Sequence, residues 1–170
     1  MVNKKIIWIL VMVVSILILL GCSGTGKTKI GTLGSTHRHA DIKVYVLGNA
    51  MDFSAQKYQL KAKEAHFEHR DGDVVHIHAT GIILGYVFLT LGMNIGNECL
   101  ILDTGNEYCN DEKAELEVFV KSAGMDWEQI YDPSDYLIQN LDKILVTYGT
   151  EDGEGIKKQM ESVTDKAAGV

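Results

Sequence analysis

Short segments of this chain alternate between apolar and polar residues, and most are bounded by glycine, asparagine or aspartate. A period of two residues in segments rich in β-branched and aromatic side chains predicts β-strands with one buried face. The predicted strands span residues 41–47, 51–54, 65–69, 74–79, 116–120 and 143–148, with a hairpin between 99–102 and 107–109.

Residues 82–91 follow a different pattern, because they are apolar almost all round. Thr80 precedes this segment as a suitable N-cap, and Gly92 follows it in the position of a C-cap. The pattern predicts a buried helix that packs against the sheet. The β-branched residues of the segment leave an apolar strand as the alternative.

Two parts of the strand pattern resemble each other. Residues 40–46 align with 114–120 and residues 51–53 with 125–127, both at an offset of 74. The later strands match as well after a short contraction. We interpret this as an internal repeat. Chance similarity is the alternative, because all strands favour the same residue types. The predicted fold class is α+β: two repeated β-units packed on one central apolar helix.

The N-terminus predicts export and membrane attachment. Lys4 and Lys5 precede an apolar run from Ile6 to Leu20, which rises about 22 Å as a helix against the ~30 Å of a hydrocarbon core. The run ends in Leu19-Leu20-Gly21-Cys22, which resembles a lipobox whose Cys22 becomes the lipidated first residue. An uncleaved signal anchor, which stays as a transmembrane helix, is the alternative. In both cases the lysines predict that the rest of the chain faces the extracytoplasmic side.

Four regions are expected along the chain. Residues 1–22 form the signal or anchor, and residues 23–36, rich in Gly, Ser, Thr and Lys, form a flexible linker. Residues 37–149 carry the predicted strands and helix and form one globular domain. The charged tail 150–170 has apolar residues at an amphipathic spacing, which fits a helix, with a frayed tail as the alternative.

The net charge of the chain limits the classes of molecule that it is expected to bind. The chain carries a net charge of −7, and removing residues 1–21 with their two lysines brings it to −9. This acidic balance argues against nucleic acid as a partner. Residues 21–28 match the phosphate-loop pattern, but an export helix precedes them and a linker follows, so we expect no nucleotide.

Two cysteines, Cys99 and Cys109, remain once Cys22 is lipidated. In an oxidising compartment such a pair predicts a disulfide, which here closes the predicted hairpin. Two reduced, buried thiols are the structural alternative. The spacing is not the Cys-x-x-Cys of reactive thiol pairs.

All six histidines lie between His37 and His78. His37 and His39 form one His-x-His pair, and His76 and His78 form another. On a strand, residues two apart share a face. Two such pairs on adjacent strands bring four imidazoles together, a donor set that suits copper or zinc.

Further candidate ligands lie close to these pairs in the sequence. His66 can join the same site, and Asp41 can bind the metal or orient an imidazole. His69 and Glu68 are optional or supporting ligands. The second β-unit has no histidine at the matching positions, so packing alone does not explain the histidines of the first. A polar, solvent-facing side of the sheet is the alternative.

The order of elements also resembles β-grasp domains of the transcobalamin-like type. The segments 71–81 and 85–92, which include His-Ile-His-Ala-Thr-Gly, resemble a family of uncharacterised membrane-anchored archaeal proteins across residues 37–149. That resemblance implies an extracytoplasmic domain without an assigned activity. Some of these chains carry a protein-disulfide isomerase label, which needs a Cys-x-x-Cys that this sequence lacks.

The main functional hypothesis is a membrane-anchored, extracytoplasmic protein that captures or delivers copper or zinc through its histidines. The alternative is a β-grasp-type interaction module that binds another extracytoplasmic protein without metal. Thiol-disulfide or other metalloenzyme activity is a lesser alternative, because no His-Glu-x-x-His motif or Ser-His-Asp arrangement accompanies the histidines.

Overall fold

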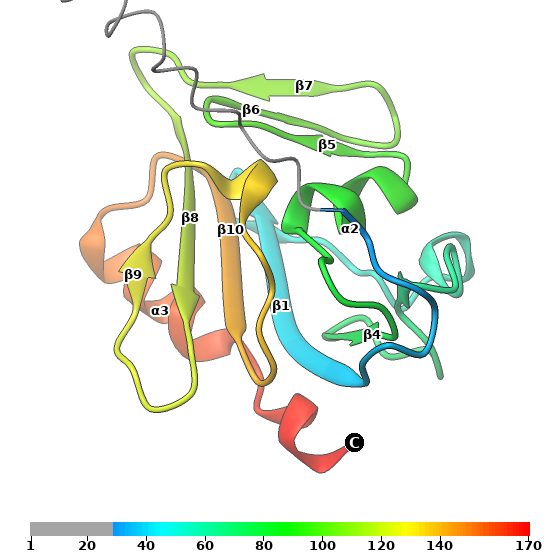
Figure 1. Ribbon diagram of the computed structural model, residues 1–170. Helices are drawn as coiled ribbons and strands as arrows, with labels where there is room; N and C mark the ends of the chain where they lie inside the picture. The colour runs from blue at the N-terminus through cyan, green and yellow to red at the C-terminus, as the bar shows by residue number, and fades with distance from the viewer. Residues whose placement is uncertain (1–28) are drawn as a thin grey trace, which may run out of the picture.

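Two β-sheets organise the structure, a computed structural model that describes residues 29–170 (Figure 1). The predicted signal or anchor and the first part of the predicted linker lie outside these residues. The large sheet has the order β3-β4-β1-β10-β8-β9, with β2 paired to β1, and the small sheet has the order β5-β6-β7. This β-rich architecture agrees with the predicted α+β class.

The elements have the following bounds. The large sheet contains β1 (Arg38–Val46), β2 (Asn49–Ala50), β3 (Ala65–His66), β4 (Val74–Ile77), β8 (Glu115–Lys121), β9 (Glu128–Gln129) and β10 (Lys143–Gly149). The small sheet contains β5 (Asn94–Ile95), β6 (Cys99–Ile101) and β7 (Glu107–Cys109). The helices are α2 (Leu84–Thr90) and α3 (Gly153–Ser162), and the 3-10 turns are η1 (Gln56–Tyr58), η2 (Pro133–Asp135) and η3 (Lys166–Gly169).

Strand β1 is central, because it pairs parallel with β10 and antiparallel with β4 and β2. Its even-numbered residues Ala40, Ile42 and Val44 enter the main core, where they meet α2. The odd-numbered residues point to the opposite face, as the two-residue period of a strand requires. That second face carries the candidate site.

Helix α2 is shorter than the sequence predicts. The expected N-cap Thr80 is wrong: the helix begins at Leu84 with Ile83 at the N-cap. Residues 82 and 83 stay extended because they pair with the segment before β10: the backbone N–H of Leu84 donates to Tyr136, and that of Ile138 donates to Ile82. The tertiary pairing thus prevails over the local helical pattern.

The C-terminus of α2 agrees with the prediction. Gly92 has a φ of 76° and follows the C-cap Leu91. Its N–H donates to the carbonyl of Leu89, and the N–H of Met93 donates to Phe88. These two hydrogen bonds form a Schellman motif, in which glycine adopts the left-handed conformation at little steric cost.

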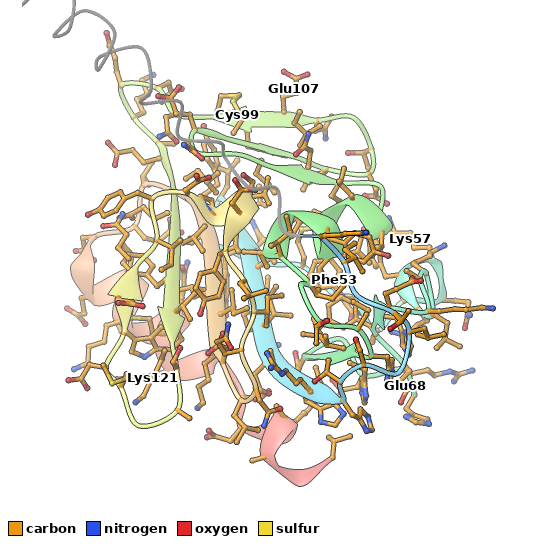
Figure 2. All side chains as sticks on the ribbon, in the orientation of Figure 1. Phe53, Lys57, Glu68, Cys99, Glu107 and Lys121 are labelled. Atoms are coloured by element: carbon orange, nitrogen blue, oxygen red, sulfur yellow. A yellow bond between two sulfur atoms is a disulfide. The ribbon has the colours of Figure 1, made fainter. Side chains whose placement is uncertain are left out.

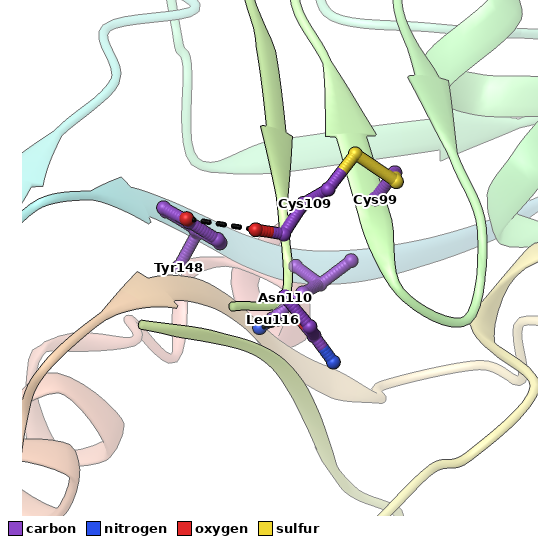
Figure 3. Close-up of a disulfide and its surroundings, with 5 residues drawn as sticks. All are labelled: Cys99, Cys109, Asn110, Leu116 and Tyr148. Carbon is purple, nitrogen blue, oxygen red and sulfur yellow. Dashed lines mark hydrogen bonds between the residues drawn. A yellow bond between two sulfur atoms is a disulfide. The ribbon is translucent and has the colours of Figure 1, made fainter. Parts of the chain in front are cut away.

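The small sheet is attached to the large one by a few specific contacts (Figure 3). Cys99 and Cys109 occupy directly paired positions of β6 and β7 and are joined by a disulfide, as the sequence predicts for this hairpin. The Tyr148 hydroxyl, at the end of β10, donates to the Cys109 carbonyl over 2.9 Å. Asn110 accepts from the Leu116 N–H over 2.6 Å.

The C-terminal segment covers the second face of the large sheet. α3 lies behind the sheet in Figure 1, on the side away from α2, and the Tyr45 hydroxyl of β1 contacts Ser162 over 2.8 Å. Val163 and Ala167 are buried. The tail from residue 150 is therefore a helix that belongs to the domain, and the predicted boundary at 149 does not separate it.

The N-terminal residues of the described segment are also docked. The Gly31 N–H donates to Thr80 over 2.8 Å, and the Gly34 N–H donates to His78 over 2.7 Å. Ile30 packs against the main core. The interpretation of 23–36 as a flexible linker is thus wrong for its last part. Within 29–170 no helix is long and apolar enough to cross a membrane.

The two segments of the predicted repeat both form antiparallel strand pairs, β1 with β4 and β8 with β10. The short return strand predicted at 51–54 lies earlier, as β2 at Asn49–Ala50. A positive φ at both Leu47 and Gly48 makes the turn tight enough for this immediate return.

Candidate metal centre

Five of the six histidines gather on the second face of the large sheet, at the end where β1 begins. Strand β4 lies between β3 and β1, and its His76 pairs in register with His66 of β3 and with His39 of β1. The neighbouring residues of these strands enter the main core instead. Because the pleat alternates, the imidazoles of all three strands share one face.

His37, His39 and His76 form the tightest group, which we call the inner site. Each offers a ring nitrogen, and these three atoms all lie within 4.8 Å of one another. The ring centroids of His37 and His39 are 4.8 Å apart, and those of His39 and His76 are 4.7 Å apart. His37 is exposed, whereas His39 and His76 are 8% and 4% exposed.

The Nε2 atom of His39 tests whether this group fits a metal. It is buried and has no hydrogen-bond partner within 29–170. An unpaired polar atom in a protein interior costs about 1–3 kcal/mol. A metal ion bound to its lone pair removes that cost, and the two other imidazoles supply the nearest further donors.

The rings of His78 and His66 lie next to the inner site. The ring of His78 lies 5.0 Å from that of His37 and 5.1 Å from that of His66. The Nδ1 atom of His66 is 2.7 Å from the carbonyl oxygen of Ala62. A carbonyl only accepts, so Nδ1 carries a proton, and in the neutral ring Nε2 is then the nitrogen with the free lone pair. This hydrogen bond fixes the ring in the way that metal-bound histidines are usually fixed.

The carboxylate of Glu68, which is labelled in Figure 2, contacts the imidazoles of His66, His69 and His76. Its Oε1 lies 3.4 Å from Nδ1 of His76 and 3.3 Å from Nδ1 of His69. Its Oε2 lies 3.4 Å from Nε2 of His66. The carboxylate therefore links the histidine of β4 to that of β3.

Burial keeps the His39 and His76 side chains of the inner site neutral. Burial lowers the pKa of His76 to about 4, and Glu68 only partly offsets this. Burial also lowers the pKa of His39 and of His78, with repulsion from neighbouring imidazoles in the same direction. Near neutral pH these rings therefore present lone pairs rather than protons, which is the state that binds metal.

The pKa of Glu68 is lowered as well, but for a different reason. Burial favours a higher value, but the imidazoles of His76, His69 and His66 together outweigh burial and hold the pKa of this carboxyl below its usual range. Glu68 is therefore an anion near neutral pH, where His39 and His76 are neutral. Together they form a nitrogen and oxygen donor set with one negative charge.

Two sequence candidates lie differently from the expectation. Asp41 shares the histidine face, but its carboxylate accepts from the Thr164 hydroxyl and from the backbone N–H groups of Lys166 and Ala167. It holds the C-terminal segment, so we leave it out of the proposed ligands. His69 lies on an exposed turn with a φ of 56°, and only its contact with Glu68 links it to the group.

The C-terminal segment is the part of this region that the sequence interpretation missed. The Lys166 ammonium binds Asp71 and Asp73 over 2.9 and 2.7 Å, beside the start of β4. The segment thus closes one side of the histidine face. The sequence feature that could have indicated helix α3 is its N-cap Asp152, whose side chain accepts from the Gly155 N–H.

Comparisons with known protein families, with curated proteins and with solved structures found no match to this chain.

Proposed function

We propose that this protein binds a divalent transition-metal ion, copper or zinc, at the inner site formed by His37, His39 and His76. The observation that carries the proposal is the convergence of their three ring nitrogens within 4.8 Å of one another. Neutral imidazole is a ligand for both metals. Capture or delivery of the ion is the role we propose.

The geometry needs only a modest closure to hold an ion. Zn–N bonds of about 2.0–2.1 Å in a tetrahedral site place the nitrogens about 3.3 Å apart. The inner nitrogens span up to 4.8 Å, so side-chain rotation of the exposed His37 brings the set together. His39 and His76 lie on paired strands and supply the fixed part of the site.

The exposure of the three ligands favours capture and release over a permanent structural role. His37 is open to solvent, whereas the other two rings are buried. A site with one mobile, exposed ligand gives an ion a route in and out. Three protein ligands also leave a coordination position free for a partner or for water.

The setting of the domain is part of the same proposal. We propose attachment to the extracytoplasmic face of a membrane through Cys22 or an N-terminal helix, with the disulfide Cys99–Cys109 suited to that compartment. In the strand order β4-β1-β10-β8, the central strands β1 and β10 are parallel and each pairs antiparallel with its outer neighbour. Along the chain, α2 follows β1 and β4 and precedes β8 and β10. This arrangement supports a β-grasp-like unit. Another extracytoplasmic protein is the partner that we propose for delivery.

Metal uptake tests the proposal directly. The purified full-length protein is dialysed against micromolar Zn²⁺ or Cu²⁺, and bound metal is measured by elemental analysis. The double variant His39→Asn/His76→Asn removes the Nε2 donors but leaves an amide in the place of each Nδ1. We expect the double variant to lose the ion of the inner site.

A matched control and a stability assay complete the test. His69→Asn makes the same substitution at a histidine whose side chain is 82% exposed, and it should bind metal as the wild type does. Metal at 100 times its Kd stabilises the folded state by about 2.7 kcal/mol, so the melting temperature should rise by several degrees in wild type and in His69→Asn, and by less in the double variant. No uptake of either metal, or equal uptake by the double variant, refutes the proposal.

A further inference from the structure

We propose that Glu68 and His66, with His78 as a third ligand, hold a second divalent metal ion beside the inner site. We call this group the outer site. The inference rests on the proposed metal-binding function and extends it from one ion to two. The ion expected there is of the zinc type, because the donor set combines imidazole nitrogen with carboxylate oxygen.

His66 and Glu68 direct a ring nitrogen and a carboxylate oxygen at each other. Nδ1 of His66 donates to the Ala62 carbonyl, so in the neutral ring Nε2 carries the lone pair, and this atom lies 3.4 Å from the Glu68 carboxylate. The His66 side chain is 10% exposed, so bulk water is largely excluded from it. A cation between the two atoms converts this unfavourable contact into two coordinate bonds.

The spacing of these two donors fits a zinc ion. Ligands of a tetrahedral zinc ion lie about 3.3 Å apart, as Zn–N and Zn–O bonds of about 2.0–2.2 Å require. The separation of His66 Nε2 and Glu68 Oε2 is 3.4 Å. It exceeds the 2.7–3.2 Å of an ordinary N–H···O hydrogen bond and matches the edge of such a coordination shell.

His78 lies beside this pair. Its ring lies 5.1 Å from that of His66 and is half-buried on the same face. Its ring also lies 5.0 Å from that of His37, so His78 stands between the two groups, and the outer site is the one of the two that otherwise lacks a third ligand. Glu68 contacts the outer His66 through Oε2 and the inner His76 through Oε1. One carboxylate thus connects two adjacent donor sets.

The stoichiometry of zinc binding tests the inference. The full-length protein is dialysed against Zn²⁺, and bound zinc per chain is measured for wild type, Glu68→Gln and His66→Asn. His66→Asn keeps an amide donor for the Ala62 carbonyl but removes Nε2, so it changes the ligand and not the hydrogen bond. We expect two ions in wild type and one in each variant.

Two further variants make the result specific. Glu107→Gln makes the same charge change on β7, at the opposite end of the molecule from Glu68 (Figure 2), and should retain two ions. His39→Asn should lose the inner ion only and retain one. Melting curves in chelator confirm that each variant is folded, and either Glu68→Gln or His66→Asn suffices if the other does not fold.

The outcomes separate this inference from the proposed function. No zinc in wild type refutes both. One ion in wild type that only His39→Asn loses overturns the outer site and leaves the inner one standing. One ion that the outer-site variants lose and His39→Asn keeps refutes the proposed inner site. Two ions in wild type and in both outer-site variants also overturn it, since a proton then bridges Glu68 and His66. Loss of both ions in Glu68→Gln overturns the division into two sites.

Discussion

The buried imidazole of His76 makes the metal-free protein sensitive to acid. Burial holds the pKa of His76 at about 4 in the folded state, against an ordinary value of about 6.5 in the unfolded chain. The unfolded state therefore binds more protons between these two values, and stability rises with pH. The contribution of His76 is fully present above about pH 6.5 and is lost as the pH falls toward 4.

The two pKa values determine the size of the effect. Between about pH 8 and about pH 5, protonation of the unfolded chain costs the folded state about 2 kcal/mol through this one residue. His39 and His78 have lowered pKa values and act in the same direction. Glu68 has a pKa below its usual range, so it stays ionised in this interval and does not contribute.

Urea unfolding in chelator at several pH values measures this contribution. The perturbation is His76→Asn, which removes the titrating ring and keeps a donor toward Glu68. The free energy of unfolding of wild type should fall by about 2 kcal/mol more than that of the variant over the same pH range. His69→Asn, at an exposed turn, should follow wild type.

The comparison uses slopes rather than absolute stabilities. Any cavity left by the smaller Asn lowers stability equally at every pH and therefore cancels. If His76→Asn loses as much stability as wild type between about pH 8 and about pH 5, then His76 is not protected from protonation, and the reasoning from its burial is refuted.

Two further predictions concern the scaffold. Replacing Cys99 and Cys109 by Ser should lower the free energy of unfolding by about 2.7 kcal/mol, the chain-entropy value for a separation of 10 residues; urea midpoints equal to those of the oxidised wild type would contradict this. Gly85→Ala should destabilise the fold by about 1–3 kcal/mol, because its new Cβ would lie 2.6 Å from the carbonyl oxygen of Ser134. Gly153→Ala, which meets nothing within 4 Å at the start of α3, should be neutral or stabilising by up to about 1 kcal/mol, so equal melting temperatures for the two variants would refute the steric argument.

The sequence predicted the position of an element well where the pattern of neighbouring residues alone determines its conformation. The alternation of β1, β8 and β10 gave their positions within a few residues, since strand faces follow a two-residue period. The hairpin of Cys99 and Cys109 followed in the same way. The prediction failed at the start of α2, where residues 82 and 83 pair with the distant segment 136–138.

By itself, the sequence determined that His37 shares a face with His39, and His76 with His78, because side chains two apart on a strand point the same way. Only the tertiary structure decided that β4 lies between β3 and β1, in the register that sets His76 beside both His66 and His39. It also decided that Asp41 holds the C-terminal segment instead of an imidazole. The physical reason is that strand register and the docking of distant segments depend on pairing between parts of the chain that local periodicity does not encode.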